Sequence, residues 1–478
     1  MRNFNVVTRV AAILTASLAL AACGADDASV AAVPDDVAAA DATGTLDDAV
    51  TDDAAPDVAV EDAVPEDTGI DAAKDVVYKD GPFETATHYT LPQLVYGGVD
   101  VLHHPHIVTV TFAGDPYADQ FEKFGATIQT LNWWDTWAPS YCSAMGACVG
   151  KGDSDKVRLG STAAKSYTDS TYPNGPSTIR QFLKTRLDSA DLPAPVTDTL
   201  YVVYLPQGTQ VQLSGSATSP ADKSCQSFGG YHHSMPYGTG QIAYAIIPEC
   251  KGFAQGMTQL ESALFASSHE ISEAVTDPYT SPGTQTSPYG GFNINVLDQN
   301  VLAWIFALGG GEVGDLCPNL PYPGFGIAEE GGYKLTRVWS NIAAKGSHNP
   351  CVPADPGPYF NVAPEKNKGT HVKIEQGASA TIVLHAFSDM PVKAWSLTAI
   401  DMDPYQGGGT ALTFSFDGQD SITVNNGDIV NMTITRDANA QTASPYGAIA
   451  MLVSTSADGQ STNYWPIWSY TQAELMGP

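Results

Sequence analysis

Apolar positions in the first two thirds of the chain follow two different periods. Short apolar runs bounded by turn residues predict strands over 106–112, 200–205 and 241–248. Apolar residues spaced three and four apart predict helices over 117–134 and 177–187. Strands interspersed with helices indicate a mixed, α/β-type arrangement, which we class as an α+β domain.

A further helix is specified at both of its ends. Thr258 and Glu261 have the spacing of a capping box, and Pro278 ends the helical pattern. The apolar stripe that we expect to face the core consists of Leu260, Leu264, Ile271 and Val275. His269 and Glu273 lie on a different face of the same helix.

The last part of the chain has the alternation that is typical of strands only. Apolar and polar residues alternate over 371–374, 380–384, 412–416 and 432–435, with turn signals between them. Several short strands with regular turns predict an all-β sandwich. Because the composition changes near residue 354, we predict two domains, an α+β domain over 83–354 and an accessory β-sandwich domain over 355–478.

The N-terminus has the pattern of a targeting signal. Arg2 and Arg9 flank the start of an apolar run that is too short to cross a bilayer comfortably. The run ends on Leu20-Ala21-Ala22-Cys23, which resembles the lipobox of bacterial lipoproteins. We expect residues 1–22 to be a signal peptide and Cys23 to carry the lipid, with an ordinary secretory signal as the alternative. The expected location is the bacterial cell envelope, at the outer membrane or the cell surface.

Residues 23–82 are expected to be a disordered, Ala- and Asp-rich tether. The stretch 24–80 has 15 Asp and 2 Glu against 2 Lys, a net charge of −15, which is half of the −30 of the whole chain. Such a segment cannot bury enough apolar surface to offset the entropy of ordering it. The negative charge also argues against a nucleic acid as partner.

The cysteines beyond Cys23 are even in number, which indicates disulfides in an exported protein. They are Cys142, Cys148, Cys225, Cys250, Cys317 and Cys351. Pairing of neighbours along the sequence is the simplest arrangement, since each bond then closes a local loop. Their spacing matches no cysteine-based zinc cluster.

His269, Glu270 and Glu273 carry the most informative candidate chemistry. Residues four apart share a helix face, so His269 and Glu273 can bind one metal ion while Glu270 acts as the base that activates a water. The pattern is that of a zinc-peptidase helix with a glutamate in place of the second histidine. A hydrolytic zinc site needs three protein ligands and one open position, so a third ligand must come from elsewhere.

Two carboxylates downstream are the main candidates for that third ligand. Glu312 and Asp315 share a glycine-rich turn, and the sequence does not rank them. Asp277 is one helical turn beyond Glu273, but the proline after it directs the backbone away. A carboxylate from 312–315 within reach of both His269 and Glu273 would favour a metal site, and its absence would favour a non-catalytic protein.

Five segments occur in a characteristic order: 201–206, 230–232, 269–278, 311–317 and 339–341. Together they resemble a family of secreted bacterial and fungal zincin-like proteins, themselves distantly similar to the plant phosphate-induced, Exordium-like proteins. The resemblance covers about residues 105–352 and implies a zincin-like, metallopeptidase-like domain. It implies His269 and Glu273 as metal ligands and Glu270 as the base.

These observations predict a membrane-anchored, extracytoplasmic zinc metallopeptidase-like protein. His232 is expected to act as a further ligand or as an oxyanion donor. The expected cofactor is Zn²⁺, with Ca²⁺ as the alternative because Glu273 makes the ligand set richer in oxygen. We expect a monomer that acts on a peptide or protein. The alternative is a non-catalytic envelope protein that binds a protein or a cell-surface glycan on a metal-stabilised or degenerate zincin-like fold.

Overall fold

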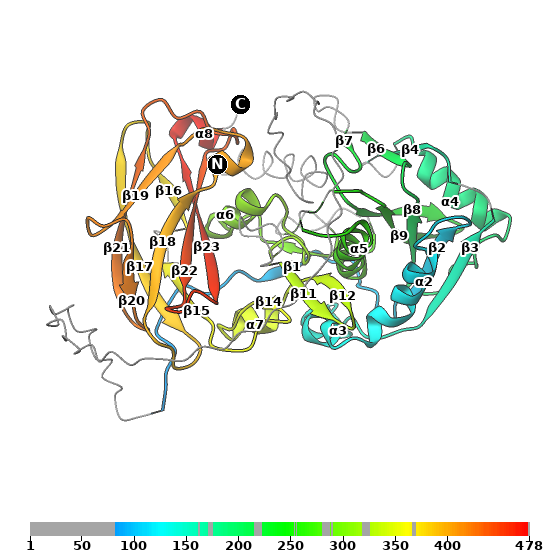
Figure 1. The fold of residues 1–478 in the computed structure, drawn as a ribbon, viewed down its shortest axis with the longest axis horizontal. Coiled ribbons are helices and arrows are strands. Elements are labelled where there is room, and N and C mark those ends of the chain that lie inside the picture. Colours follow the sequence, from blue (N-terminus) through cyan, green and yellow to red (C-terminus); the bar gives the residue numbers. More distant parts are fainter. Residues whose placement is uncertain are drawn as a thin grey trace, which may run out of the picture. The chain divides into compact units, whose positions relative to one another are not determined.

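A mixed five-stranded sheet forms the centre of the first part of the chain (Figure 1). In order across the sheet, its strands are β3 (Ser154–Leu159), β2 (His106–Phe112), β5 (Thr199–Leu205), β9 (Gly240–Pro248) and β8 (Tyr231–Tyr237). The first four are mutually parallel, and β8 pairs antiparallel with β9 at one edge. The three predicted strands, which correspond to β2, β5 and β9, are confirmed to within one residue.

The computed structural model describes residues 82–476, except for 161–162, 171–174, 215–221, 253, 255, 280–286, 288–289, 318–325 and 366–369. The predicted signal peptide, Cys23 and nearly all of the predicted tether therefore lie outside the described residues. Residues 84–478 belong to one compact unit.

The helix predicted over 117–134 is wrong as a single helix. The chain forms α2 (Ala118–Thr127), the short 3₁₀ helix η1 (Ile128–Thr130) and α3 (Asn132–Trp137). Leu131 is extended, with φ −70° and ψ 146°, so it separates η1 from α3. The carboxylate of Glu330 accepts hydrogen bonds from the backbone N–H groups of Asn132 and Trp133 at 2.6 and 2.7 Å, which starts α3 from a distant part of the sequence.

The two other predicted helices are confirmed. Helix α4 (Thr178–Asp188) begins at Ser177, whose hydroxyl accepts the N–H of Arg180. Helix α5 (Gln259–Thr276) begins with both reciprocal bonds of the capping box between Thr258 and Glu261. A helix with a single apolar stripe would expose its polar side to solvent. Helix α5 does not, because nearly every residue from Ser262 to Thr276 is buried.

Smaller elements surround the central sheet and α5. Paired short strands are β1 (Leu94–Tyr96) with β10 (Phe292–Ile294), β11 (Ile327–Glu330) with β12 (Tyr333–Thr336), and β13 (Val338–Trp339) with β14 (Cys351–Val352). A three-stranded sheet contains β4 (Ser166–Ser170), β6 (Gln210–Ser214) and β7 (Asp222–Lys223). The remaining helices of this part are η2 (Ala138–Ser140), α6 (Gln299–Leu308) and α7 (Asn341–Lys345).

The C-terminal part forms two β-sheets of a sandwich, drawn in yellow to red in Figure 1. One sheet has the order β15 (Phe360–Pro364), β17 (Ser379–Ser388), β21 (Ile429–Arg436) and β19 (Leu412–Phe416). The other has the order β16 (His371–Lys373), β23 (Thr462–Tyr470), β22 (Ala448–Thr455), β18 (Trp395–Asp401) and β20 (Ile422–Val424). Two short helices, η3 (Asp403–Gln406) and α8 (Gln472–Met476), complete this part. All four predicted strand segments fall within these strands, apart from one residue at the end of β16.

Inward-facing apolar residues explain the sandwich. In β21, Val430, Met432 and Ile434 are buried while the residues between them are exposed or partly exposed, which is the period-two pattern of a strand covered on one face. Trp304 of α6 packs on Trp339, and on Trp465 of the sandwich, with ring centroids 5.1 and 5.7 Å apart. The predicted domain boundary between 354 and 355 stays a prediction.

The three disulfides confirm that cysteines pair with their neighbours in sequence. The pairs are Cys142–Cys148, Cys225–Cys250 and Cys317–Cys351. Such bonds persist in oxidising surroundings, so they indicate an extracellular or periplasmic protein. Within the described part of the chain, no helix is both long and apolar enough to cross a membrane.

Two neighbouring acidic residues, Glu249 and Asp115, follow the C-terminal ends of β9 and β2. Glu249 follows β9 and is 3% exposed, and it accepts a hydrogen bond from Gln259 at 2.9 Å. Burial, together with the charge of Asp115, raises the pKa of Glu249 to about 8. Because the folded protein binds this proton more tightly than the unfolded chain does, protonated Glu249 adds to the free energy of unfolding. This contribution is at its full value below about pH 4.5 and is lost as the pH rises through 8.

Glu249→Gln is therefore expected to stabilise the protein by about 1–2 kcal/mol at pH 8 and to leave it almost unchanged at pH 4.5, because glutamine stays neutral. Melting temperatures measured from pH 4.5 to 9 test this, with the exposed Glu329→Gln as control. A wild-type and a variant curve that run parallel across this range would contradict it.

Candidate functional site

Helix α5 brings its three predicted site residues together in the protein interior. His269, Glu270 and Glu273 are 7%, 4% and 4% exposed. The imidazole Nε2 of His269 lies 3.2 Å from Oε1 of Glu273, one helical turn away. The spacing of four residues thus places a nitrogen and an oxygen donor side by side, as the sequence predicted.

Asp315 joins this group, so of the two downstream candidates it is the one that lies beside His269. Its Oδ1 lies 3.6 Å from Nε2 of His269. Donor atoms of His269, Glu273 and Asp315 all lie within 4.8 Å of one another, and all three residues are buried. Asp315 precedes the Cys317–Cys351 disulfide by two residues, and its Oδ2 accepts the N–H of Glu312 at 3.0 Å. The turn that carries Asp315 is therefore held from both sides.

His232 enters the site from the edge strand β8. Its Nδ1 lies 3.4 Å from Oε2 of Glu270 and 3.5 Å from Oε2 of Glu273. Its other nitrogen, Nε2, lies 3.7 Å from Oε1 of Glu312. Glu312 thus lies against His232, whereas Asp315 lies against His269. His232, Glu270 and Glu273 form a second group of donors within 4.8 Å of one another.

Glycines allow the backbone to approach these side chains closely. A Cβ atom at Gly314 would lie 2.9 Å from both Oε1 of Glu273 and Nδ1 of His269, and one at Gly230 would lie 2.9 Å from Cγ of Glu270. At Gly310 it would lie 2.0 Å from Oδ2 of Asp315. The sequence showed that the downstream turn is rich in glycine, but it did not show which glycines contact the site.

The carboxylates raise the pKa of both histidines. Burial alone disfavours the charged imidazolium of His232, but Glu312, Glu270 and Glu273 outweigh it and raise its pKa well above 6.5. For His269, burial has the same opposing effect, and the charge of Glu273 overcomes it and raises the pKa to about 10. Both rings therefore lie in a strongly negative environment.

The carboxylates differ from one another in how readily they ionise. Burial opposes ionisation of Glu273, yet the two histidines lower its pKa to about 2. Burial and the charge of Glu273 raise the pKa of Asp315 to about 7 and that of Glu312 well above 4.5. Burial also raises the pKa of Glu270. Glu273 is therefore the carboxylate around which the negative charge of the site is centred.

Asp277 lies beside this group, and its side chain accepts a hydrogen bond from the backbone. It caps the C-terminus of α5, and its Oδ1 accepts the N–H of Gly291 at 2.8 Å. Burial raises its pKa to about 6, with His232 and Glu273 among its charged neighbours. The expectation that Asp277 is not a ligand of the helix site agrees with this backbone contact.

The arrangement of donors fits a metal ion. Oε1 of Glu273 is buried without a hydrogen bond from any described residue, although Nε2 of His269 lies 3.2 Å from it. In a tetrahedral site with bonds of about 2.0–2.2 Å, neighbouring donors are about 3.3–3.6 Å apart. The separations of 3.2 and 3.6 Å around Nε2 of His269 are close to that range. These side chains could therefore hold a metal ion.

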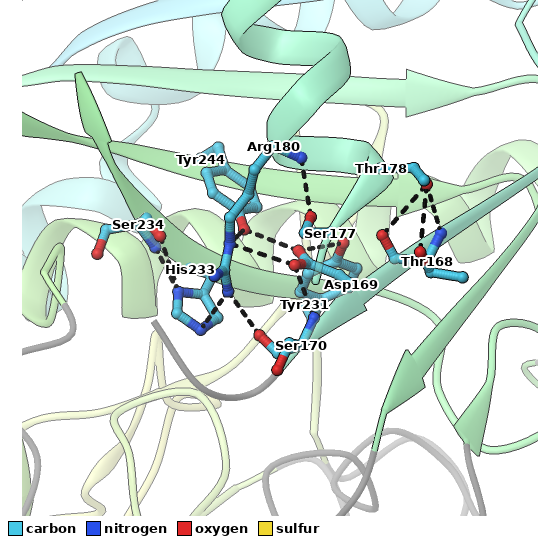
Figure 2. Close-up of polar contacts among 10 residues, drawn as sticks. All are labelled: Thr168, Asp169, Ser170, Ser177, Thr178, Arg180, Tyr231, His233, Ser234 and Tyr244. Carbon is cyan, nitrogen blue, oxygen red and sulfur yellow. Dashed lines mark hydrogen bonds and ion pairs between the residues drawn. The ribbon is translucent and has the colours of Figure 1, made fainter. Parts of the chain in front are cut away.

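A buried polar network holds His233 of β8, the residue next to His232 (Figure 2). Arg180 of α4 lies 3.3 Å from Asp169, and donates to the hydroxyl of Tyr244 at 3.0 Å and to Nε2 of His233 at 3.1 Å. Because neighbouring side chains on a strand point to opposite faces, fixing His233 also fixes the direction of His232. The sequence does not indicate this network, because its members come from two stretches of the chain that lie far apart, 168–180 and 231–244.

No protein-family model matches the chain, and no curated protein sequence matches it. Among solved structures, a FixG-related protein from Vibrio parahaemolyticus is 12% identical, covers 25% of this chain and 99% of its own, and has a TM-score of 0.18. Domain 1 of VCBP3 from Branchiostoma floridae is 9% identical, with 25% and 98% coverage and a TM-score of 0.16. A family 123 glycoside hydrolase from Clostridium perfringens is 8% identical, with 24% and 27% coverage and a TM-score of 0.18. Such scores assign neither a family nor a function.

Gly314→Ala is expected to weaken Zn²⁺ binding at least about tenfold while the fold is retained, because the new Cβ displaces Glu273 and His269. Titration calorimetry with Zn²⁺ measures the affinity, and a melting curve reports the fold. Gly240→Ala is the matched control, since its Cβ would meet nothing within 4 Å. Equal affinities in the two variants would contradict this role of Gly314.

Proposed function

We propose that this protein is an exported, metal-dependent hydrolase that cleaves peptide bonds. The observation that supports this proposal best is the buried group of His269, Glu273 and Asp315 with Glu270 beside it. Three ligands and an adjacent carboxylate are the protein groups that metal-assisted hydrolysis requires. The resemblance of residues 105–352 to zincin-like proteins points to the same chemistry.

Each side chain has a distinct role in this proposal. His269, Glu273 and Asp315 would hold the ion, which when bound supplies Lewis acidity toward a carbonyl oxygen and lowers the pKa of water. Glu270, one residue from His269, takes the proton from the attacking water and passes it to the leaving amine. His232, whose Nδ1 lies 3.4 Å from Glu270, orients that carboxylate or donates to the developing oxyanion.

The donor set favours zinc over calcium. Calcium takes six to eight oxygen ligands in general, whereas each donor group here contains an imidazole nitrogen. Imidazole together with carboxylate suits zinc and its first-row neighbours. Glu273 in place of a second histidine lowers the Lewis acidity of the ion, so we expect a slow hydrolase.

The proposed location rests on the N-terminal segment of the chain. A lipid on Cys23 and an acidic tether over 23–82 would hold the domain at the bacterial cell envelope, where it acts as a monomer on peptides or proteins. A non-catalytic protein that binds a protein or cell-surface glycan is the competing proposal. The position of Asp315, 3.6 Å from His269 and grouped with Glu273, favours the hydrolase, because a degenerate site has no reason to retain a third ligand.

Glu270→Gln is expected to lower peptide cleavage by at least about 100-fold, because the base is lost, while the ion held by His269, Glu273 and Asp315 is retained. Cleavage of a casein and peptide library, followed by mass spectrometry, measures the activity. Metal analysis of the same sample measures the ion, and Glu329→Gln is the exposed control.

Removal of the metal with 1,10-phenanthroline is expected to abolish cleavage by the wild type, and added Zn²⁺ to restore it. Full cleavage by the metal-free protein, or by Glu270→Gln, would refute the proposed hydrolase.

A further inference from the structure

We infer that the site binds two metal ions, with Glu273 as the carboxylate that bridges them. The inference deepens the proposed metal-dependent function and rests on it. It adds a second ion, of the same first-row class, on His232, Glu270 and Glu273, beside the ion on His269, Glu273 and Asp315. The geometry of Glu273 is the starting point.

The two oxygens of Glu273 face two different histidines. Oε1 lies 3.2 Å from Nε2 of His269, and Oε2 lies 3.5 Å from Nδ1 of His232. The two donor groups therefore share Glu273 and no other residue. A carboxylate that offers one oxygen to each of two nitrogen donors has the arrangement of a bridge between two ions.

At the second group, the long hydrogen bond between His232 and Glu270 also has the length that separates two donors of one ion. Nδ1 of His232 lies 3.4 Å from Glu270 and 3.5 Å from Glu273. An N–H···O hydrogen bond is about 2.7–3.2 Å long, whereas neighbouring donors of a tetrahedral ion are about 3.3–3.6 Å apart. His232 is 10% exposed at its side chain, so the surrounding protein and not bulk water determines these contacts.

Glu312 has the position of an orienting residue behind the second ion. Metal-binding histidines generally donate their other ring N–H to a carboxylate, which fixes the tautomer and the direction of the ring. His232 presents Nδ1 to Glu270 and Glu273, and its Nε2 lies 3.7 Å from Oε1 of Glu312. This is a charge contact longer than a hydrogen bond, so Glu312 would orient the ring electrostatically. In the sequence, Glu312 and Asp315 are alternative candidates for the third ligand. In the structure each lies beside a different histidine, Glu312 beside His232 and Asp315 beside His269.

Counted with its ligands ionised, as metal binding requires, the acidic cluster also favours more than one divalent ion. Five acidic residues gather here: Glu270, Glu273, Asp277, Glu312 and Asp315. Every ion pair that the described residues give to the carboxylates of this group is with His232 or His269. One divalent ion would leave most of this charge uncompensated in the interior, and two would nearly balance it.

A second ion changes how the site would act on a peptide. Two ions about 3.5–4 Å apart can bind both the attacking and the carbonyl oxygen of one substrate, so charge that develops on either is stabilised. Glu270 would then be a ligand of the second ion in addition to its proposed role as the base. This arrangement compensates for the weaker Lewis acidity that Glu273 imposes on a single ion.

The test is to count the ions bound by the full-length protein. The chain is loaded with Zn²⁺ or Mn²⁺, and the ions are counted by plasma mass spectrometry and native mass spectrometry. Two ions per chain are expected in the wild type, and one in His232→Ala, in Asp315→Asn and in Glu270→Gln. Glu273→Gln, which removes the bridge, is expected to weaken both sites at least 100-fold. His104→Ala, at an exposed histidine outside the site, is the control and should bind two.

A second measurement keeps the inference testable if His232→Ala does not fold. Manganese ions joined by a carboxylate give an exchange-coupled electron paramagnetic resonance spectrum, which the wild type should show and His232→Gln should lose. Binding that saturates at one ion per wild-type chain, with no coupled spectrum, would overturn the inference. Two bound ions without cleavage would instead refute the proposed hydrolase and leave the two-ion site standing.

Discussion

Burial of like charges beside one helix is the constraint on which the rest of this structure depends. Donor atoms of Glu273 lie within 4.8 Å of those of Glu270 and of Asp315 in the interior, where unpaired charge is strongly unfavourable. Two imidazoles offset part of that cost, and a bound cation would offset more. Such a cluster persists only if the surrounding fold holds it rigidly, since the carboxylates would otherwise move apart into water.

The surrounding fold meets that requirement from three directions. Helix α5 is covered on nearly all sides and begins with a complete capping box, so its three site residues have fixed positions. The turn of Asp315 ends at the Cys317–Cys351 disulfide. The edge strand β8, which carries His232, is held by the network around Arg180 (Figure 2). Glycines at 230, 310 and 314 leave the space in which these elements meet.

Local features of the fold were predictable because their causes are local. Alternation and apolar runs located the strands, and the cap at Thr258 located α5. The break at Leu131 was not predictable, because the residue that starts α3 is Glu330, about two hundred positions away. The same limit applies to Arg180 and His233, which are 53 positions apart and meet only through the tertiary fold.

The sequence by itself determined which chemistry is available: a histidine and two glutamates on one capped helix, and an even number of cysteines beyond Cys23. Tertiary structure decided how those groups are used. It placed Asp315 beside His269 and Glu312 behind His232, and it turned the two oxygens of Glu273 toward different histidines. The reason is physical: helical periodicity fixes neighbours three or four residues apart, whereas contacts between α5, β8 and the 311–317 turn depend on how these elements pack.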